Sequence, residues 1–279
     1  MPMNQLEFSM FTLGGSLLAG LLGSLTGLGG GVVLVPMLVL LFGVDIHYAI
    51  GASLISVIAT SSGSAAAYVR EGYSNIRIGM FLEVATTLGA VGGAWLATRT
   101  PTRGIAIVFG LVLLYSVYLS FQRHDDEVVA HNPWCDRLKM NSTFPGPDGN
   151  LQQYSVKHIS GGFGTMVGAG ALSGLLGIGS GAVKVLAMDH IMRIPFKVST
   201  TTSNFMIGVT AAASAGIYLR RGYIDPSLAA PVMIGVLVGS LIGARLLVKS
   251  NVKSLRLVFS VVIFFLAIEM IYNGWVGKV

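Results

Sequence analysis

Four glycines interrupt a long apolar run near the start of the chain, and this interruption constrains the fold more than any other feature. Gly27, Gly29, Gly30 and Gly31 lie inside an apolar stretch at residues 11–42. Each glycine costs on the order of 1 kcal/mol relative to alanine in a helix. As a single helix the stretch would be about 48 Å long, whereas the hydrocarbon core of a bilayer is about 30 Å thick. The sequence therefore predicts two helical legs joined by a non-helical turn.

The composition places this turn inside a membrane. Only 11% of the 279 residues are charged and 53% are hydrophobic, whereas soluble domains carry about 25% charged residues. The chain is therefore predicted to be an all-α polytopic membrane protein. Backbone groups that a break frees inside a bilayer must be satisfied by protein or by a water-filled cavity. A broken helix at this depth is thus a candidate binding site.

The two halves of the chain repeat one another at a constant offset of 150 residues. The offset aligns three glycines of the first turn with three glycines of a second turn, and it aligns Ser53 with Ser203. One offset that holds over about 100 positions indicates a duplication. The duplication predicts a first transmembrane repeat at 1–122, a polar linker at 123–158 and a second transmembrane repeat at 159–279.

Each repeat is expected to contain a glycine-broken pair of helical legs and then three continuous spans. The legs are predicted near 9–26 and 31–43, and near 159–176 and 182–192. The spans are predicted near 48–69, 78–98 and 104–121, and near 198–219, 227–247 and 254–275. The second legs, at about 16–20 Å, are too short to cross a bilayer. We therefore interpret each pair as a half-spanning hairpin. When the longer first leg of each pair is counted with the six continuous spans, we expect eight full spans and two half-spanning elements, or ten spans on a looser count.

The distribution of Lys and Arg favours inverted repeats. If each broken pair enters and leaves on one side, 12 of these residues fall on one face and 5 on the other, with Lys184 inside the membrane. If each pair crosses once, the repeats are parallel and the counts are 9 and 8. Cytoplasmic faces carry the excess of positive charge. We therefore expect an inner-membrane protein with a cytoplasmic linker and both termini outside, and we attribute the net charge of +6 to this rule rather than to nucleic-acid binding.

The two glycine-rich turns are interpreted as halves of an anion site. Paired broken helices in inverted repeats are typical of secondary transporters, whose substrate binds near the midplane where the repeats meet. Helix N-termini present free N–H groups and a positive dipole end, which suit an anion. The candidates are Gly27, Gly29, Gly30, Gly31, Gly177, Gly179, Ser180 and Gly181. The alternative is that these small residues only allow tight helix packing.

One lysine lies at membrane depth. Lys184 follows Gly181 by three residues among apolar neighbours, where the first repeat has Leu34. An ionisable residue at this depth is expensive and is a functional candidate by default. Lys184 would either pair with a bound anion or change charge during transport. The alternative is a lysine that snorkels to the cytoplasmic interface.

Polar side chains near the start of the next span could complete the coordination of an oxyanion. The candidates are Thr201, Thr202 and Asn204 in the second repeat, with Ser53, Ser56 and Thr60 as a weaker counterpart in the first. For the hydroxyls the alternative is capping or bonding to helix carbonyls. Asn204 lies too far inside the span to fit a capping role.

Two carboxylates, Glu83 and Glu269, lie within apolar spans, and either could bind a coupling proton. Each is about two turns from a membrane face, so placement at the interface is the preferred interpretation. Cys135 is the one cysteine of the chain, which excludes an intramolecular disulfide and a multi-cysteine metal site. No metal or other cofactor is expected.

Three motifs resemble the TauE/SafE sulfite exporter family. They are Gly-Leu-Gly-Gly-Gly-x-x-x-x-Pro at 27–36, Ala-x-Gly-x-Ser-Leu at 49–54 and Tyr-x-x-x-Gly-Tyr at 68–73. The resemblance covers nearly the whole chain outside the linker. It implies a bacterial or archaeal inner-membrane carrier that moves sulfite, sulfoacetate or a related sulfur oxyanion or organosulfonate, usually outward. Ser180 and Leu186 depart from the motif in the second repeat, and the linker is unusually long, so the substrate is left open.

These observations predict a secondary transporter that exports a small sulfur-containing anion by alternating access, with proton coupling left open. An anion channel of the same fold is the first alternative, and a membrane enzyme or scaffold is the second. No convergent catalytic cluster supports an enzyme. The expected partners are the anion and the lipid bilayer, and the choice between a monomer and a homodimer is left open.

Overall fold

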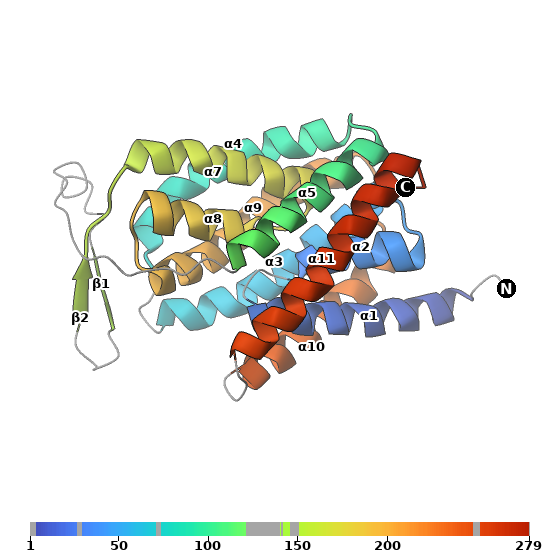
Figure 1. The fold of residues 1–279 in the computed structure, drawn as a ribbon, viewed down its shortest axis with the longest axis horizontal. Helices are drawn as coiled ribbons and strands as arrows, with labels where there is room; N and C mark the ends of the chain where they lie inside the picture. The colour runs from blue at the N-terminus through green and yellow to red at the C-terminus, as the bar shows by residue number, and fades with distance from the viewer. Residues whose placement is uncertain are drawn as a thin grey trace.

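The chain folds into an elongated bundle of helices (Figure 1). The structure, a computed structural model, describes residues 4–26, 30–70, 74–120, 140, 142–145, 151–247 and 252–278. The first half contains α1 (Gln5–Thr26), α2 (Gly31–Phe42), α3 (Ile46–Arg70), α4 (Ile76–Ala97) and α5 (Thr102–Ser120). The second half contains α7 (Ile159–Leu176), α8 (Gly181–Leu186), η1 (Ala187–Ile191), α9 (Phe196–Arg220), α10 (Pro226–Leu247) and α11 (Val252–Val276). The prediction of an all-helical membrane-embedded part is confirmed, and helix ends differ from those predicted by a few residues.

Both predicted breaks are present. In the second half α7 ends at Gly177, whose φ of +67° is left-handed and whose N–H bonds to the carbonyl oxygen of Ser173 at 2.8 Å. Glycine adopts this conformation without the penalty that a Cβ would add. In the first half α1 ends at Thr26 and α2 begins at Gly31. Gly27 and Gly29 lie outside the described residues.

The sequence predicts one regular helix for the second leg of the second half, but the structure has two short segments there. The six residues of α8 pass directly into the five-residue π-helix η1. The equivalent leg of the first half, α2, is one α-helix of 12 residues that contains Pro36. Wider π-type turns often mark functional sites.

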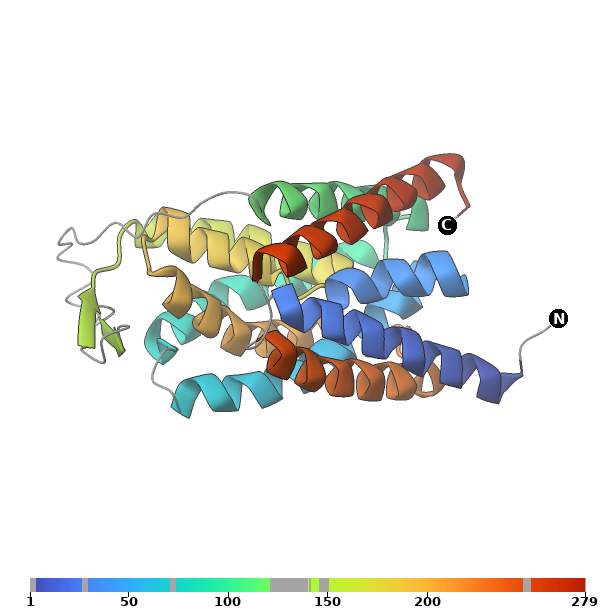
Figure 2. The same cartoon turned by 60° about the horizontal axis from the view of Figure 1, so that its bottom comes forward.

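The two halves interleave. α4 of the first half packs along α7 of the second, and α1 packs along α10 in the corresponding way. Both contacts depend on glycine, because a methyl group at Gly89 would collide with the carbonyl oxygen of Val167, and one at Gly239 would collide with that of Leu17. The two contacts are equivalent in the duplication, because the offset of 150 residues relates Gly89 to Gly239 and Leu17 to Val167. Figure 2 shows α1 beside α10, and α5 beside α11.

The ends of the bundle differ. α1 begins and α11 ends at one end, whereas α7 begins at the opposite end, beside a β-hairpin (Figure 1). The hairpin pairs β1 (Ser142–Pro145) with β2 (Leu151–Tyr154) in antiparallel register, Ser142 opposite Tyr154. It belongs to the linker and was not predicted. The linker sequence also suggests a short surface helix near 133–140, a segment that falls almost wholly outside the described residues.

Four helices of the described part are long and apolar enough to cross a membrane. Their apolar windows are Leu6–Gly23, Ile76–Ala97, Ile159–Leu176 and Pro226–Gly243. The apolar windows in α3, α5 and α11 are shorter. The prediction of eight full spans therefore stays a prediction, while a multi-pass membrane protein agrees with the helices observed.

Candidate functional site

Three helices bring a lysine, a threonine and a glutamate together in the interior. Lys184 of α8 is fully buried, and its Nζ donates a hydrogen bond to Oγ1 of Thr210 on α9 at 2.5 Å. The Thr210 hydroxyl in turn donates to Oε1 of Glu83 on α4 at 2.7 Å. Because α4 belongs to the first half and α8 and α9 to the second, this polar cluster lies where the halves meet. We call these three residues the Lys–Thr–Glu relay.

The hydroxyl of Thr210 has a choice of acceptors. Its single proton can go to Glu83 Oε1, to the backbone oxygen of Met206 at 3.0 Å or, at the longer distance of 3.4 Å, to Thr86 Oγ1. A hydroxyl offers one donor and two acceptor lone pairs, so it can accept from Lys184 in either arrangement. Thr210 can therefore adjust its hydrogen bonding when the charge of Glu83 changes.

The two oxygens of the Glu83 carboxyl group differ in their surroundings. Oε1 also accepts a hydrogen bond from the hydroxyl of Thr87 at 3.2 Å. Oε2 is buried and has no hydrogen-bond partner among the described residues. A buried acceptor of this kind is exceptional in proteins and calls for an explanation.

The structure corrects one of the sequence-based interpretations of these two residues. The snorkelling alternative for Lys184 is wrong, because its ammonium group bonds to Thr210 inside the bundle. Glu83 is only 8% exposed, because α4 is packed between α7 and α9, so its side chain faces the interior of the bundle, while its distance from a membrane face stays a prediction. Glu269 lies exposed on α11 and is not part of the Lys–Thr–Glu relay.

The two glycine-rich turns approach one another. Ser53 Oγ on α3 donates to the carbonyl oxygen of Gly177 at 2.7 Å. A methyl group added to Gly31 would lie 2.7 Å from Ser53 Oγ and 3.1 Å from the Gly177 oxygen. Ser203 Oγ reaches the carbonyl oxygen of Gly181 at 3.3 Å. Two serines at equivalent positions of the duplication therefore bond to carbonyls of the second turn.

The second turn has an unusual backbone. Gly179 has a φ of +70° and Ser180 a φ of +45°, although serine carries a Cβ. The left-handed conformation is unfavourable for such a residue and marks functional sites when it occurs. The Ser180 hydroxyl is buried and without a hydrogen-bond partner in the described part of the chain. Ser180 lies one helical turn before Lys184, and its carbonyl oxygen accepts the Lys184 N–H at 3.0 Å.

Several predicted hydroxyl ligands bond to backbone groups. Ser56 donates to Ser53 O at 2.8 Å, Thr60 to Ser56 O at 3.0 Å and Thr201 to Val198 O at 3.1 Å. These are the bonds to helix carbonyls expected of the alternative interpretation.

The other predicted positions differ in what they contact. Thr202 Oγ1 accepts from the backbone N–H of Asn75 at 3.0 Å, which joins α9 to the start of α4. Asn204 is half-buried, and its side chain makes no hydrogen bond to another described residue. Gly30 is buried and packs near Val236 of α10.

The sequence reasoning missed the central residue of the relay. Neither Thr210 nor Thr87 is among the candidate residues that the sequence pattern indicates. A hydroxyl in the middle of an apolar span is a weak signal, because it usually bonds to its own helix. Only packing shows that Thr210 faces a lysine and a glutamate.

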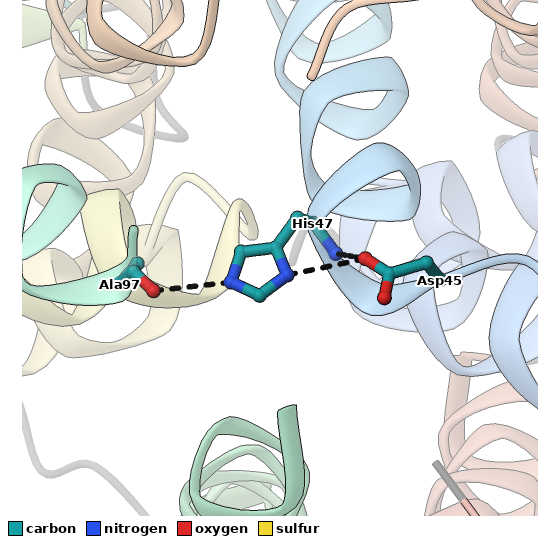
Figure 3. A network of polar contacts seen from close by, with 3 residues as sticks. All are labelled: Asp45, His47 and Ala97. Carbon is teal, nitrogen blue, oxygen red and sulfur yellow. Dashed lines mark hydrogen bonds and ion pairs between the residues drawn. The ribbon is translucent and has the colours of Figure 1, made fainter. Parts of the chain in front are cut away.

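A second polar network joins the start of α3 to the end of α4. His47 Nδ1 is 3.1 Å from Asp45 Oδ1, and its Nε2 is 3.1 Å from the Ala97 carbonyl oxygen (Figure 3). The ring also stacks on Tyr223 at 4.8 Å. Ala97 is about 21 Å along α4 from Glu83, so this network fastens helix ends and is separate from the relay. No cluster of three or more His, Cys, Asp or Glu that could hold a metal occurs within the described ranges.

Comparison with known proteins gives a consistent assignment. The family described as Sulfite exporter TauE/SafE matches residues 12–270. The probable membrane transporter protein YunE of Bacillus subtilis (strain 168) is 28% identical over 266 residues, which cover 92% of this chain and 95% of that protein. A probable membrane transporter protein of Xylella fastidiosa (strain 9a5c) is 24% identical over 271 residues, 96% of this chain and 97% of that protein. No solved structure matches the chain significantly.

Proposed function

The chain belongs to the sulfite exporter TauE/SafE family, and we propose on this premise that it is a secondary transporter that exports a small sulfur-containing anion. Sulfite, sulfoacetate and related organosulfonates are the substrates proposed. The names of its relatives as probable membrane transporter proteins support the general function. The substrate and the direction are our inference from the family.

Burial of Lys184 is the observation that carries this proposal. The residue is a cation with 0% exposure on the short leg α8, next to a left-handed turn. Ionisable residues in membrane interiors mark substrate and ion pathways. An ammonium group at this place supplies the positive charge that a sulfonate or sulfite needs.

The transport mechanism proposed is alternating access by two inverted repeats. The reciprocal packing of α4 on α7 and of α1 on α10 supports a duplicated architecture. α1 and α7 are equivalent in the duplication but begin at opposite ends of the bundle (Figure 1), and this arrangement supports the inversion. The charge distribution supports a cytoplasmic linker and outside termini in a cell membrane.

The anion site is proposed between the two glycine-rich turns, close to Lys184. The contact of Gly31 with Gly177 supports convergence of the turns. Asn204 and Ser180 supply polar groups that have no hydrogen-bond partner among the described residues. Thr201 and Thr202 remain proposed ligands, although their hydroxyls also bond to backbone groups.

Ligand-induced stabilisation of the purified protein in detergent tests the site. Sulfite, thiosulfate, sulfate, sulfoacetate, taurine and acetate would be compared by thermal shift on the wild type, Lys184→Ala and Asn204→Ala. Lys278→Ala is the matched control, because Lys278 is exposed at the end of the chain. We expect one sulfur anion to stabilise the wild type and the control but neither site variant. Stabilisation by acetate alone would contradict the sulfur assignment.

Transport in proteoliposomes separates a carrier from an anion channel of the same fold. Labelled anion outside vesicles should enter faster when unlabelled anion is inside, because a carrier exchanges one for the other. A channel gives no such acceleration. Absence of acceleration would therefore replace the proposed transporter with a channel.

A further inference from the structure

We propose that Glu83 is the residue that binds a coupling proton during transport. The anion replaces Glu83 as the partner of the Lys184 ammonium group, and Glu83 takes up one proton in the same step. The inference rests on the proposed function, since it requires an anion at Lys184. It deepens that function by assigning the coupling ion and the residue that carries it.

The charge balance of the Lys–Thr–Glu relay is the first argument. Lys184 and Glu83 are both buried, and the neutral Thr210 hydroxyl joins them through bonds of 2.5 and 2.7 Å. We take Lys184 as an ammonium ion and Glu83 as a carboxylate, so that the ligand-free relay holds one positive and one negative charge. An anion that binds Lys184 adds a second negative charge to an interior that solvates charge poorly. Uptake of one proton by Glu83 restores neutrality.

The carboxyl group has a place for that proton. Oε2 of Glu83 is buried and without a hydrogen-bond partner among the described residues, whereas Oε1 accepts from Thr210 and Thr87. A proton on Oε2 leaves both of these bonds possible. The reaction is Glu83 carboxylate plus H⁺ giving the carboxylic acid, while Lys184 stays an ammonium ion and no other bond is made or broken.

Thr210 connects the two binding events. When Glu83 becomes neutral, the acceptor strength of Oε1 falls, and the hydroxyl proton can turn to Met206 O at 3.0 Å. Neutral acceptors form weaker hydrogen bonds than ionised ones. Protonation of Glu83 therefore removes the negative charge that holds Lys184 and leaves the ammonium group available to an anion.

The remaining charged groups near the relay are few. α7 contains no titratable side chain, and α4 carries Arg77 six residues before Glu83. α9 carries Lys197, Tyr218 and Arg220, which are eight or more residues from Thr210. These separations are about 9 Å along α4 for Arg77 and about 12 Å or more along α9 for the other three. On η1, next to α8, Asp189 lies 3.9 Å from His190. Within the described part, Glu83 is therefore the carboxylate placed to balance Lys184.

Joint binding makes the protein a symporter of proton and anion. Both ions cross in the same direction, so export of a monovalent anion moves no net charge and is driven by the outward gradient of the anion. By linkage, a ligand that binds together with one proton gains affinity tenfold for each unit by which the pH falls, as long as the free site is deprotonated.

The test measures the dissociation constants of two monovalent anions, methanesulfonate and ethanesulfonate, for the full-length protein by calorimetry from pH 5.5 to 8.5. Both probes are anions of strong acids, so their own charge does not change in this range. We expect a tenfold weakening per pH unit for the wild type and for Glu269→Gln, the exposed matched control. Glu83→Gln should bind with an affinity that does not depend on pH.

Because Glu83→Gln could fail to fold, proton uptake on the wild type is measured as well. Titrations in buffers of different ionisation enthalpy should give one proton taken up per anion bound. Binding that is independent of pH in the wild type, or an unchanged slope in Glu83→Gln, overturns the coupling and leaves the transporter proposal standing. If neither probe binds the wild type at any pH, the coupling proposal fails, and the thermal-shift panel with sulfite and sulfoacetate decides the transporter proposal separately.

Discussion

The hydroxyl of Ser53 donates a 2.7 Å hydrogen bond to the carbonyl oxygen of Gly177, and this bond joins the two halves of the protein at the second glycine-rich turn. Ser53 is fully buried on α3. Gly177 ends α7 in a left-handed conformation, so its carbonyl group has left the helical pattern. The bond satisfies a backbone acceptor at the point where the helix is broken, as a membrane interior requires.

Removal of this hydroxyl should destabilise the fold. Ser53→Ala leaves the Gly177 carbonyl without the donor, and an unsatisfied buried acceptor costs about 1–3 kcal/mol. The measurement is the thermal unfolding midpoint in detergent. Ser56→Ala is the control, because Ser56 donates only to the Ser53 carbonyl in its own helix. Equal midpoints for the two variants would contradict the role of the bond between the halves.

A methyl group at Gly89 should disturb the packing of α4 on α7. It would collide with the backbone oxygen of Val167, and backbone cannot rotate away as a side chain does. Overpacking typically costs about 1–3 kcal/mol. We expect Gly89→Ala to lower the unfolding midpoint. Gly92→Ala, on the same helix with open space around it, should be neutral or slightly stabilising because alanine favours helix.

Lys184 and Glu83 should show strong coupling in a double-mutant cycle. Lys184→Met alone leaves the buried Glu83 carboxylate without its cation, and loss of one partner of a buried pair costs about 3–5 kcal/mol. We expect the double variant Lys184→Met/Glu83→Gln to recover most of this loss, because neither charge remains. Unfolding midpoints at one pH give the cycle. Additive single effects would show that the relay does not act as a unit.

Tyr154 should make the hairpin contact sensitive to alkaline pH. Its hydroxyl accepts from Asn75 Nδ2 at 2.6 Å, and burial raises its pKa above the ordinary value, which is about 10. The folded protein thus disfavours the phenolate, so the stabilisation is complete below pH 10 and is lost as the pH rises through the folded pKa.

Tyr154→Phe gives the comparison. At pH 8 we expect the wild type to be more stable by about 1 kcal/mol, the value of one hydrogen bond. Between pH 8 and pH 11 this difference in stability should shrink. In this range the folded wild type keeps Tyr154 protonated while the unfolded chain ionises it, and the Phe variant has no such group. A difference that grows with pH would refute the assignment. Thermal midpoints of both proteins over this range provide the measurement.

Much of the architecture was readable from the sequence. Low charge identified a membrane protein, and glycine clusters gave the two helix breaks, because glycine disfavours helix regardless of its neighbours. The offset of 150 residues predicted equivalent helices, and helical segments appear within a few residues of the predicted ranges. The motifs at 27–36 and 49–54 led to the family that the comparisons then identified.

Other features depended on local conformations that the pattern does not contain. The π-helix η1 replaces part of a predicted regular leg, and the linker hairpin forms where only a connector was expected. A hairpin forms only when two segments pair with each other. The residues of these two segments have no strong preference for helix or strand, so the sequence did not indicate the pairing.

The sequence by itself determined that Lys184 and Glu83 are ionisable residues in apolar segments, and it set the cost of leaving them unpaired. It could not determine that they belong together, because they lie about 100 residues apart on different halves. The tertiary structure decided this by packing α4 against α9, which turns Thr210 toward both side chains. The sequence shows which residues can be charged. Which charges interact depends on the distance between them, and only the packing of the helices sets that distance.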